Sequence, residues 1–175
     1  TGELYSVNTD PVIEIQGDIG GAFDNSGAIT SVTATNRGIE IGGTVGNGFT
    51  NTGVINTSRA GIVVSGQITG DFLNDTAGTI ITQNDEAILL EATGTSLTGN
   101  FTNHADLEGG NGGIRTSGAV GGSFTNTGAI SAASGNGINL SGAVGTGFTN
   151  SGSIGTSVDR IGGKGIQATG AITGN

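Results

Sequence analysis

Two stretches decide the fold: residues 49–71 read FTNTGVINTSRAGIVVSGQITGD, and residues 124–147 read FTNTGAISAASGNGINLSGAVGTG. Both keep one order, which is Phe-x-Asn, a small residue, Gly, an aliphatic residue, a variable polar loop, Gly-Ile, and Ser-Gly-x-aliphatic. Three short segments of each unit alternate apolar with polar or small residues, and Gly, Asn and Ser separate them. This pattern predicts three short strands per unit.

The unit recurs along the whole chain. Phe-x-Asn occurs six times, and the units start near Phe23, Phe49, Phe72, Phe101, Phe124 and Phe148. The intervals between these residues are 26, 23, 29, 23 and 24 residues, and no Phe lies outside the series. A period in this range is typical of solenoid and propeller architectures.

Other folds fit this repeat poorly. No window keeps a 3.6-residue apolar period, and Gly, present 37 times, costs about 1 kcal/mol at an interior helical site. A propeller blade needs about 40 residues, and a leucine-rich horseshoe needs a Leu/Asn consensus that is missing. We therefore predict an all-β, right-handed parallel β-helix with three strands per rung and six to seven rungs of roughly 25 residues. Residues 1–175 are expected to form a single repeat domain, a fragment of a longer chain.

The period places like residues above one another. We expect inward columns formed by the six Phe residues and by three aliphatic series: Ile29, Ile55, Ile80, Leu107, Ile130, Ile154; Ile13, Ile39, Ile62, Ile88, Ile114, Ile138, Ile166; and Ile19, Val45, Ile68, Leu97, Val120, Val144, Ile172. Each unit buries too few side chains for independent stability, so stacking must supply the core.

An Asn follows each Phe by two residues and shares its inward parity, namely Asn25, Asn51, Asn74, Asn103, Asn126 and Asn150. Side-chain amides stacked in this way can hydrogen-bond to the rungs above and below. We expect a structural Asn ladder at a turn.

Composition and motifs argue against several classes of function. A formal net charge of −9 argues against binding to nucleic acid or to an anionic membrane surface. The chain has no Cys and a single His, and it lacks nucleophile-elbow, dinucleotide-binding and Walker motifs. We therefore expect no enzyme activity, no catalytic residues and no cofactor.

Units such as GAVGGSFTNTGAI, residues 118–130, resemble the repeats of bacterial autotransporter passenger domains and related β-helical adhesins. The resemblance covers essentially the whole chain. It implies surface display or secretion, export through an outer-membrane barrel, and a role in adhesion or as a spacer.

Three functions follow as hypotheses. The first is a structural rod or stalk of an extracellular or cell-surface protein, with host or neighbouring-cell molecules as partners. The second is a subunit that self-associates end to end through exposed strand edges. The third is a polysaccharide-active enzyme or part of one, which would need paired carboxylates beside a sugar groove.

One acidic region is a weak candidate for a cation or ligand site. It spans the two least regular units, and its acidic residues are Asp71, Asp75, Asp85, Glu86, Glu91, Asp106 and Glu108. The candidates for the site are Asp71, Asp75, His104 and Asp106. Asp75 and His104 both lie three residues after a Phe, so we expect them to be outward neighbours forming an exposed ion pair.

The position after the Gly-Ile isoleucine points outward and is apolar in two adjacent units, at Val63 and Leu89. We expect an exposed apolar spot there, which either binds a partner or lies beneath the long loop of the 29-residue unit.

Overall fold

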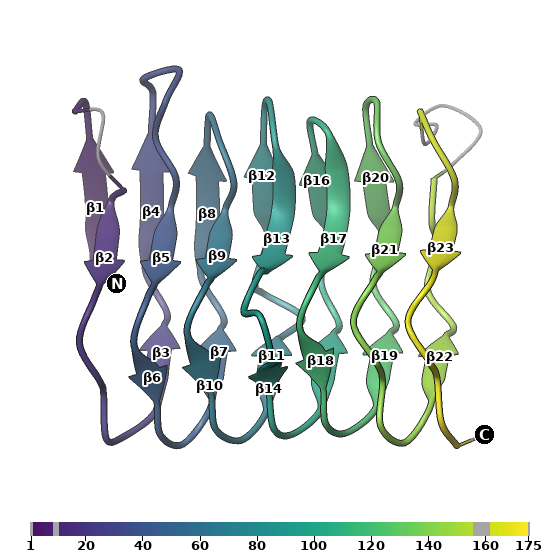
Figure 1. Ribbon diagram of the computed structural model, residues 1–175. Helices are drawn as coiled ribbons and strands as arrows, with labels where there is room; N and C mark the ends of the chain where they lie inside the picture. The colour runs from purple at the N-terminus through teal and green to yellow at the C-terminus, as the bar shows by residue number, and fades with distance from the viewer. Residues whose placement is uncertain (1, 9–10, 156–161, 175) are drawn as a thin grey trace.

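The computed structural model describes residues 2–8, 11–155 and 162–174, which form a solenoid built from four parallel sheets (Figure 1). The Phe-x-Asn segments make sheet I, which contains β3 (Phe23–Asn25), β7 (Phe49–Asn51), β11 (Phe72–Asn74), β15 (Phe101–Asn103), β19 (Phe124–Asn126) and β22 (Phe148–Asn150). Sheet II follows in each coil, with β1 (Glu3–Ser6), β4 (Ala28–Ser31), β8 (Val54–Thr57), β12 (Ile80–Thr82), β16 (Leu107–Gly109) and β20 (Ile130–Ala132).

After a turn the chain enters sheet III and then sheet IV. Sheet III contains β2 (Ile13–Ile15), β5 (Ile39–Ile41), β9 (Ile62–Val64), β13 (Glu86–Leu90), β17 (Gly112–Thr116), β21 (Ile138–Leu140) and β23 (Ile166–Ala168). Sheet IV contains β6 (Thr44–Val45), β10 (Gln67–Ile68), β14 (Thr95–Leu97) and β18 (Ala119–Val120). Every strand pairs in parallel with its counterparts in neighbouring coils, for example Phe72 with Phe49 and Phe101.

The coil is right-handed. In Figure 1 sheets III and IV face the viewer with the chain running downward, sheets I and II lie behind with the chain running upward, and successive coils advance to the right. The predicted parallel β-helix is therefore confirmed.

The four coils that run from β3 to β18 each have four strands, where the sequence predicted three. Sheet IV is separate because Gly residues bend the backbone just after sheet III. The amides of Gly42 and Gly43 both donate to the Ile15 carbonyl, at 2.7 and 3.3 Å. The next two residues, Thr44 and Val45, then form β6, which is too short to stand out in the sequence pattern.

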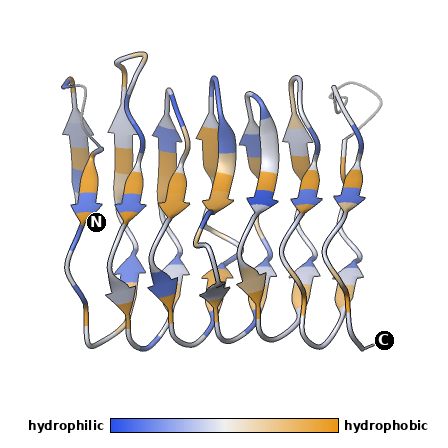
Figure 2. Ribbon diagram, viewed as in Figure 1, coloured by the Kyte–Doolittle hydropathy of each residue, from blue (hydrophilic) through white to orange (hydrophobic). Residues whose placement is uncertain are grey.

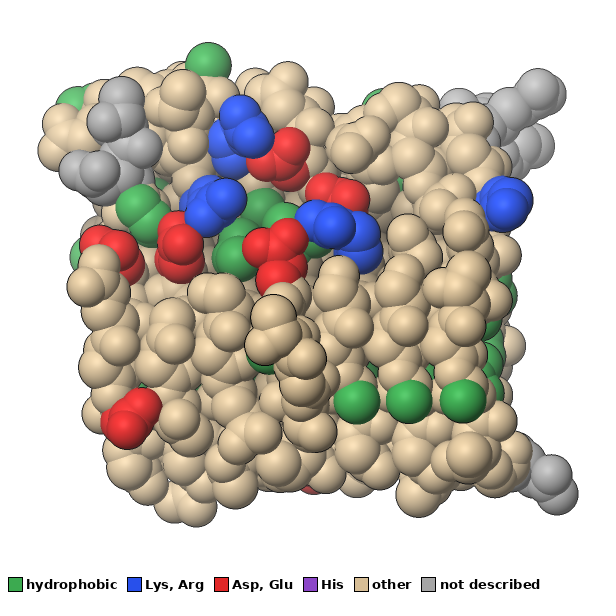
Figure 3. Space-filling model, viewed as in Figure 1, with side chains coloured by type: hydrophobic (Ala, Val, Ile, Leu, Met, Phe, Trp, Pro, Cys, Tyr) green, Lys and Arg blue, Asp and Glu red, His purple; other side chains and the backbone are tan. Residues whose placement is uncertain are grey.

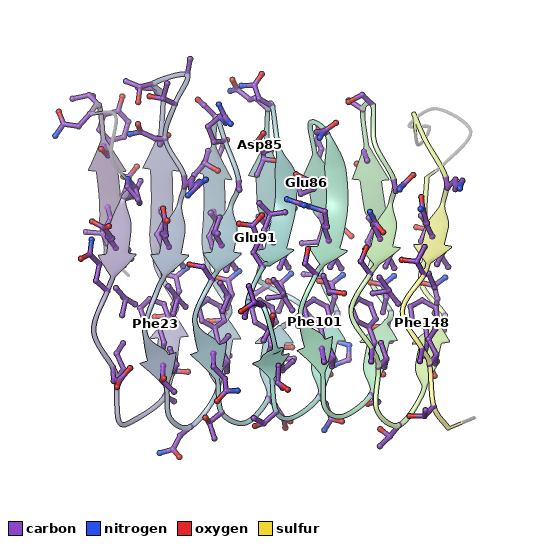
Figure 4. All side chains as sticks on the ribbon, viewed as in Figure 1. Phe23, Asp85, Glu86, Glu91, Phe101 and Phe148 are labelled. Atoms are coloured by element: carbon purple, nitrogen blue, oxygen red, sulfur yellow. The ribbon has the colours of Figure 1, made fainter. Side chains whose placement is uncertain are left out.

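The predicted columns are confirmed. The three aliphatic series align residue by residue through strand pairs and isolated bridges such as Ile19 with Val45 and Val144 with Ile172. The Phe rings stack along the axis with centroids 4.4 to 5.5 Å apart, and Phe23, Phe101 and Phe148 are labelled in Figure 4. Figure 2 shows hydrophobic segments at corresponding heights of successive coils.

A further inward column was not predicted. It runs along the ends of the sheet III strands through Ile15, Ile41, Val64, Leu90, Thr116, Leu140 and Ala168. The residue type at this position changes from Ile, Val or Leu to Thr and Ala along the chain, so the column does not stand out as a repeat in the sequence. The core therefore holds one more layer than the sequence suggested.

The Asn ladder is continuous. From Asn25 onward, each side-chain Nδ2 donates to the Oδ1 of the Asn in the next coil at 2.7 or 2.8 Å, and the series ends at Asn150. In five of the six coils the same nitrogen also reaches the carbonyl two residues ahead, at 2.9 to 3.3 Å. The ladder thus closes the turn between sheets I and II and joins the coils.

In three coils the corner between sheets IV and I contains a Gly in a conformation that favours this residue. Gly48, Gly70 and Gly147 have φ of 97°, 110° and 137°, which side-chain-bearing residues rarely adopt. The chain reverses here just before the Phe strand, so these three positions add no side-chain bulk to the corner.

Candidate functional site

The outer face of sheet I carries a column of Thr residues. In each Phe-x-Asn segment the middle residue points outward because its neighbours point inward. Strand pairing aligns these residues in the order Asp24, Thr50, Leu73, Thr102, Thr125, Thr149. This column was not predicted from the sequence, although the variable position of the repeated Phe-x-Asn motif was a signal for it.

A groove of about 660 Å³ lies on this face where Leu73 interrupts the column. Gly46, Gly48 and Gly70 are among its lining residues and leave the space open. Asp71, Leu73 and His104 line it together with the hydroxyl-bearing Thr50, Thr69 and Thr102. This groove unites two of the four predicted site residues.

Asp71 is held in place by the next coil. Its Oδ1 accepts hydrogen bonds from the Asn100 backbone amide at 2.7 Å and from the Asn100 side chain at 3.2 Å. The Asp71 side chain is exposed, and within the described residues its Oδ2 has no hydrogen-bond donor. One carboxylate oxygen is therefore structural, and the other is available to a ligand.

His104 is likewise fixed by the coil that follows it. Its Nδ1 lies 2.7 Å from the Thr127 Oγ1 of the following coil, and the residue is only half exposed. This contact leaves Nε2 as the ring nitrogen that a ligand can use.

The predicted ion pair between Asp75 and His104 is wrong. The two residues do occupy neighbouring coils, since the preceding Asn74 and Asn103 pair. However, Asp75 Oδ1 accepts a hydrogen bond from the backbone amide of Thr76 at 2.7 Å, which turns the carboxylate toward its own loop. Asp75 also lies outside the groove.

Asp106 lies at a different place, directly before β16 in the interior of sheet II. Its Oδ1 accepts a long hydrogen bond of 3.4 Å from the Ala129 amide, and it lines a hollow of about 270 Å³ with Ile81 and Glu108. Throughout residues 2–8, 11–155 and 162–174, no three His, Asp or Glu side chains gather as a metal site. The predicted acidic region is thus dispersed over separate faces.

Several of its carboxylates instead form ion pairs on the outer face of sheet III, where Figure 4 labels Asp85, Glu86 and Glu91. Arg59 Nε lies 2.6 Å from Asp85 Oδ2, and Arg115 NH2 lies 2.8 Å from Glu91 Oε1. Arg115 Nε also lies 3.2 Å from Glu86, although outside hydrogen-bonding geometry. Ion pairs therefore connect the coil of β13 to both neighbouring coils.

Val63 and Leu89 are neighbours, as predicted, but their interpretation as an exposed partner-binding spot is wrong, because both are covered. Val63 and Leu89 are 1% and 5% exposed and form a small buried cluster with Ala60. Strand pairing places Glu40 and Arg115 on either side of them in the same outward column. The stems of these charged side chains flank the cluster, and Figure 3 shows charged groups gathered around a small hydrophobic area on this face.

These features define a parallel β-solenoid with a polar groove on sheet I and an ion-pair patch on sheet III. Comparison with protein-family models, with curated proteins and with solved structures found no match for the chain. Across the described ranges, no helix has the length and apolar character needed to span a membrane.

Proposed function

We propose that this chain is a structural rod, the stalk of a bacterial cell-surface or secreted protein that serves adhesion or display. The observation that supports the proposal most strongly is the uninterrupted Asn ladder, whose five interamide bonds of 2.7 or 2.8 Å join one coil to the next. A spacer needs length and stiffness, and this ladder supports both.

The stiffness has a physical basis. Each coil contributes one Phe, one Asn and a few aliphatic residues to columns that continue into the neighbouring coils. A coil cannot bend away from its neighbour without separating the Phe rings and breaking amide bonds in the interior. Stability in such arrays depends on nearest-neighbour interfaces, so added coils lengthen the rod while its cross-section is kept.

Deletion of one coil tests the proposal. Removing residues 124–147 from the full-length protein keeps the register, because Ser123 would then be followed by Phe148, which pairs with Phe124 and occupies the equivalent position. A rod shortened by about 4.8 Å should keep its fold and its display at the surface. Circular dichroism and antibody labelling of intact cells of the source organism measure these two properties.

A deletion of residues 124–135 is the matched control. It removes about half of a coil, so it breaks the register of the strands and places unlike residues in the same columns. It should abolish folding and display. Labelling that appears only after the cells are permeabilised would refute the surface assignment. Concentration-dependent fibres in sedimentation experiments would favour the filament-forming alternative.

A further inference from the structure

We propose that the groove on sheet I binds a short segment of a neutral saccharide. The groove is defined by Asp71, Leu73, Thr102 and His104 with the glycine corner beside them, and its volume of about 660 Å³ lies within the usual range of about 300–1,000 Å³ for ligand sites. The inference adds a binding site to the rod and does not depend on the proposed stalk function.

The first argument is the chemistry of the lining. A sugar ring has an apolar face of C–H groups and a rim of hydroxyls that both donate and accept hydrogen bonds. Leu73 offers a half-buried apolar surface, and it stands between Thr50 and Thr102 in an otherwise polar column. The Thr hydroxyls beside it can donate to and accept from the rim of the ring.

The second argument is pre-organisation. Asn100 holds the Asp71 carboxylate, and Thr127 holds the His104 imidazole, so each side chain is fixed by a neighbouring coil. Each keeps one polar atom unused by the described protein atoms, Oδ2 in Asp71 and Nε2 in His104. Groups fixed before binding lose little conformational freedom on contact with a ligand.

Other ligand classes fit the groove less well. Asp71 and the net charge of −9 disfavour phosphate and nucleic acid. A peptide adding a strand needs a free sheet edge, whereas β11 is already paired on both sides, with β7 and β15. An ice surface needs a flat face, and this face is hollowed where Leu73 replaces Thr.

The test uses the 175-residue chain and four neutral probes: maltohexaose, cellohexaose, chitohexaose and mannohexaose. Amide chemical shifts are followed by NMR as each probe is added to millimolar concentration. At least one probe should shift the amides of Asp71, Leu73, Thr102 and His104 in a saturable way, while the amides of the sheet III ion-pair patch stay in place.

Two variants remove the site while keeping the fold, because they restore residues that other coils carry at the same positions. Leu73→Thr matches Thr50 and Thr125, and His104→Thr matches Thr127. Each should weaken binding by about tenfold or more. Asp75→Thr is the matched control, since Asp75 belongs to the same unit as Leu73 but lies outside the groove, and its effect should stay within about twofold.

Three results would overturn the proposal. One is the absence of saturable shifts with all four probes. Another is binding that survives both Leu73→Thr and His104→Thr. The third is a response of the same amides to calcium or spermine in place of the sugars, which would identify a cation site. None of these results bears on the coil-deletion experiment, so the two proposals fail independently.

Discussion

Asn103 Nδ2 donates to Asn126 Oδ1 at 2.7 Å and to the Ala105 carbonyl at 2.9 Å, so a single buried amide closes its own turn and joins two coils. Its Oδ1 in turn accepts from Asn74 at 2.8 Å. Both the nitrogen and the oxygen of this side chain are therefore bonded, and the interior of the rod contains a polar column beside its aromatic one.

Substitution of Asn103 by Ala should destabilise the chain strongly. The change leaves the Asn74 amide without its acceptor and the Asn126 oxygen without its donor, both in the interior. An unsatisfied buried polar group costs about 1–3 kcal/mol, and urea unfolding measures the loss. Asn150→Ala is the control, because Asn150 is exposed and its loss affects one ladder bond. Equal losses for the two variants would argue against a role for ladder continuity.

Substitution of Phe101 by Ala should cost about 3–5 kcal/mol in the free energy of unfolding. Phe101 is fully buried between Phe72 and Phe124, with ring centroids 4.9 and 4.4 Å away. The variant would leave a cavity between two rings that each lose a stacking partner. Phe148→Ala should cost clearly less, since Phe148 is half-buried and stacks on Phe124 alone among the described residues. Thermal and urea unfolding of both variants check the order.

Substitution of Gly128 by Ala should also destabilise the chain, for a steric reason. An added Cβ would lie 2.0 Å from the Ala105 carbonyl oxygen, which belongs to the backbone of the preceding coil. Overpacking of this kind costs about 1–3 kcal/mol. Gly94 has open space around the same position, so Gly94→Ala should change stability by less than about 0.5 kcal/mol. A neutral Gly128→Ala would show that the coils can separate locally at little cost.

The ion pairs on sheet III should contribute modestly and in a salt-dependent manner. A double-mutant cycle with Arg115→Gln and Glu91→Gln should give a coupling energy of about 0.2–1 kcal/mol at low salt, because both side chains are 35% exposed. In about 1 M NaCl the screening length falls to about 3 Å, so the coupling should drop to near zero. A coupling that persists in high salt would mean that the pair is shielded from solvent more than its exposure indicates.

The columns of the core were predictable because the repeat places identical residue types at identical points of every coil. Phe and Asn are recognisable at each of their six positions, and alternation in a strand dictates which of them point inward. The fourth strand of the coil was not predictable on this basis. It contains as few as two residues, and the pattern that identifies a strand needs a longer run.

The candidate site was only half predictable. Asp71 and His104 were singled out, and they do share a groove. The hydrogen bonds of Asp71 with Asn100 and of His104 with Thr127 depend on local turns that differ between units. The same is true of the positions of Asp75 and Asp106 outside the groove. Val63 and Leu89 are buried although their column points outward, and their neighbours in that column, Glu40 and Arg115, belong to other coils that a single unit does not contain.

By itself, the sequence determined that the chain winds into coils of about 25 residues with Phe, Asn and aliphatic columns inside. Periodic placement of apolar residues leaves few other ways to remove them from water. Only the tertiary structure decided which outward residues meet, because contacts across coils join positions 23 to 31 residues apart through loops of unequal length. Those loops place one histidine and one aspartate in the same groove and turn a second aspartate away.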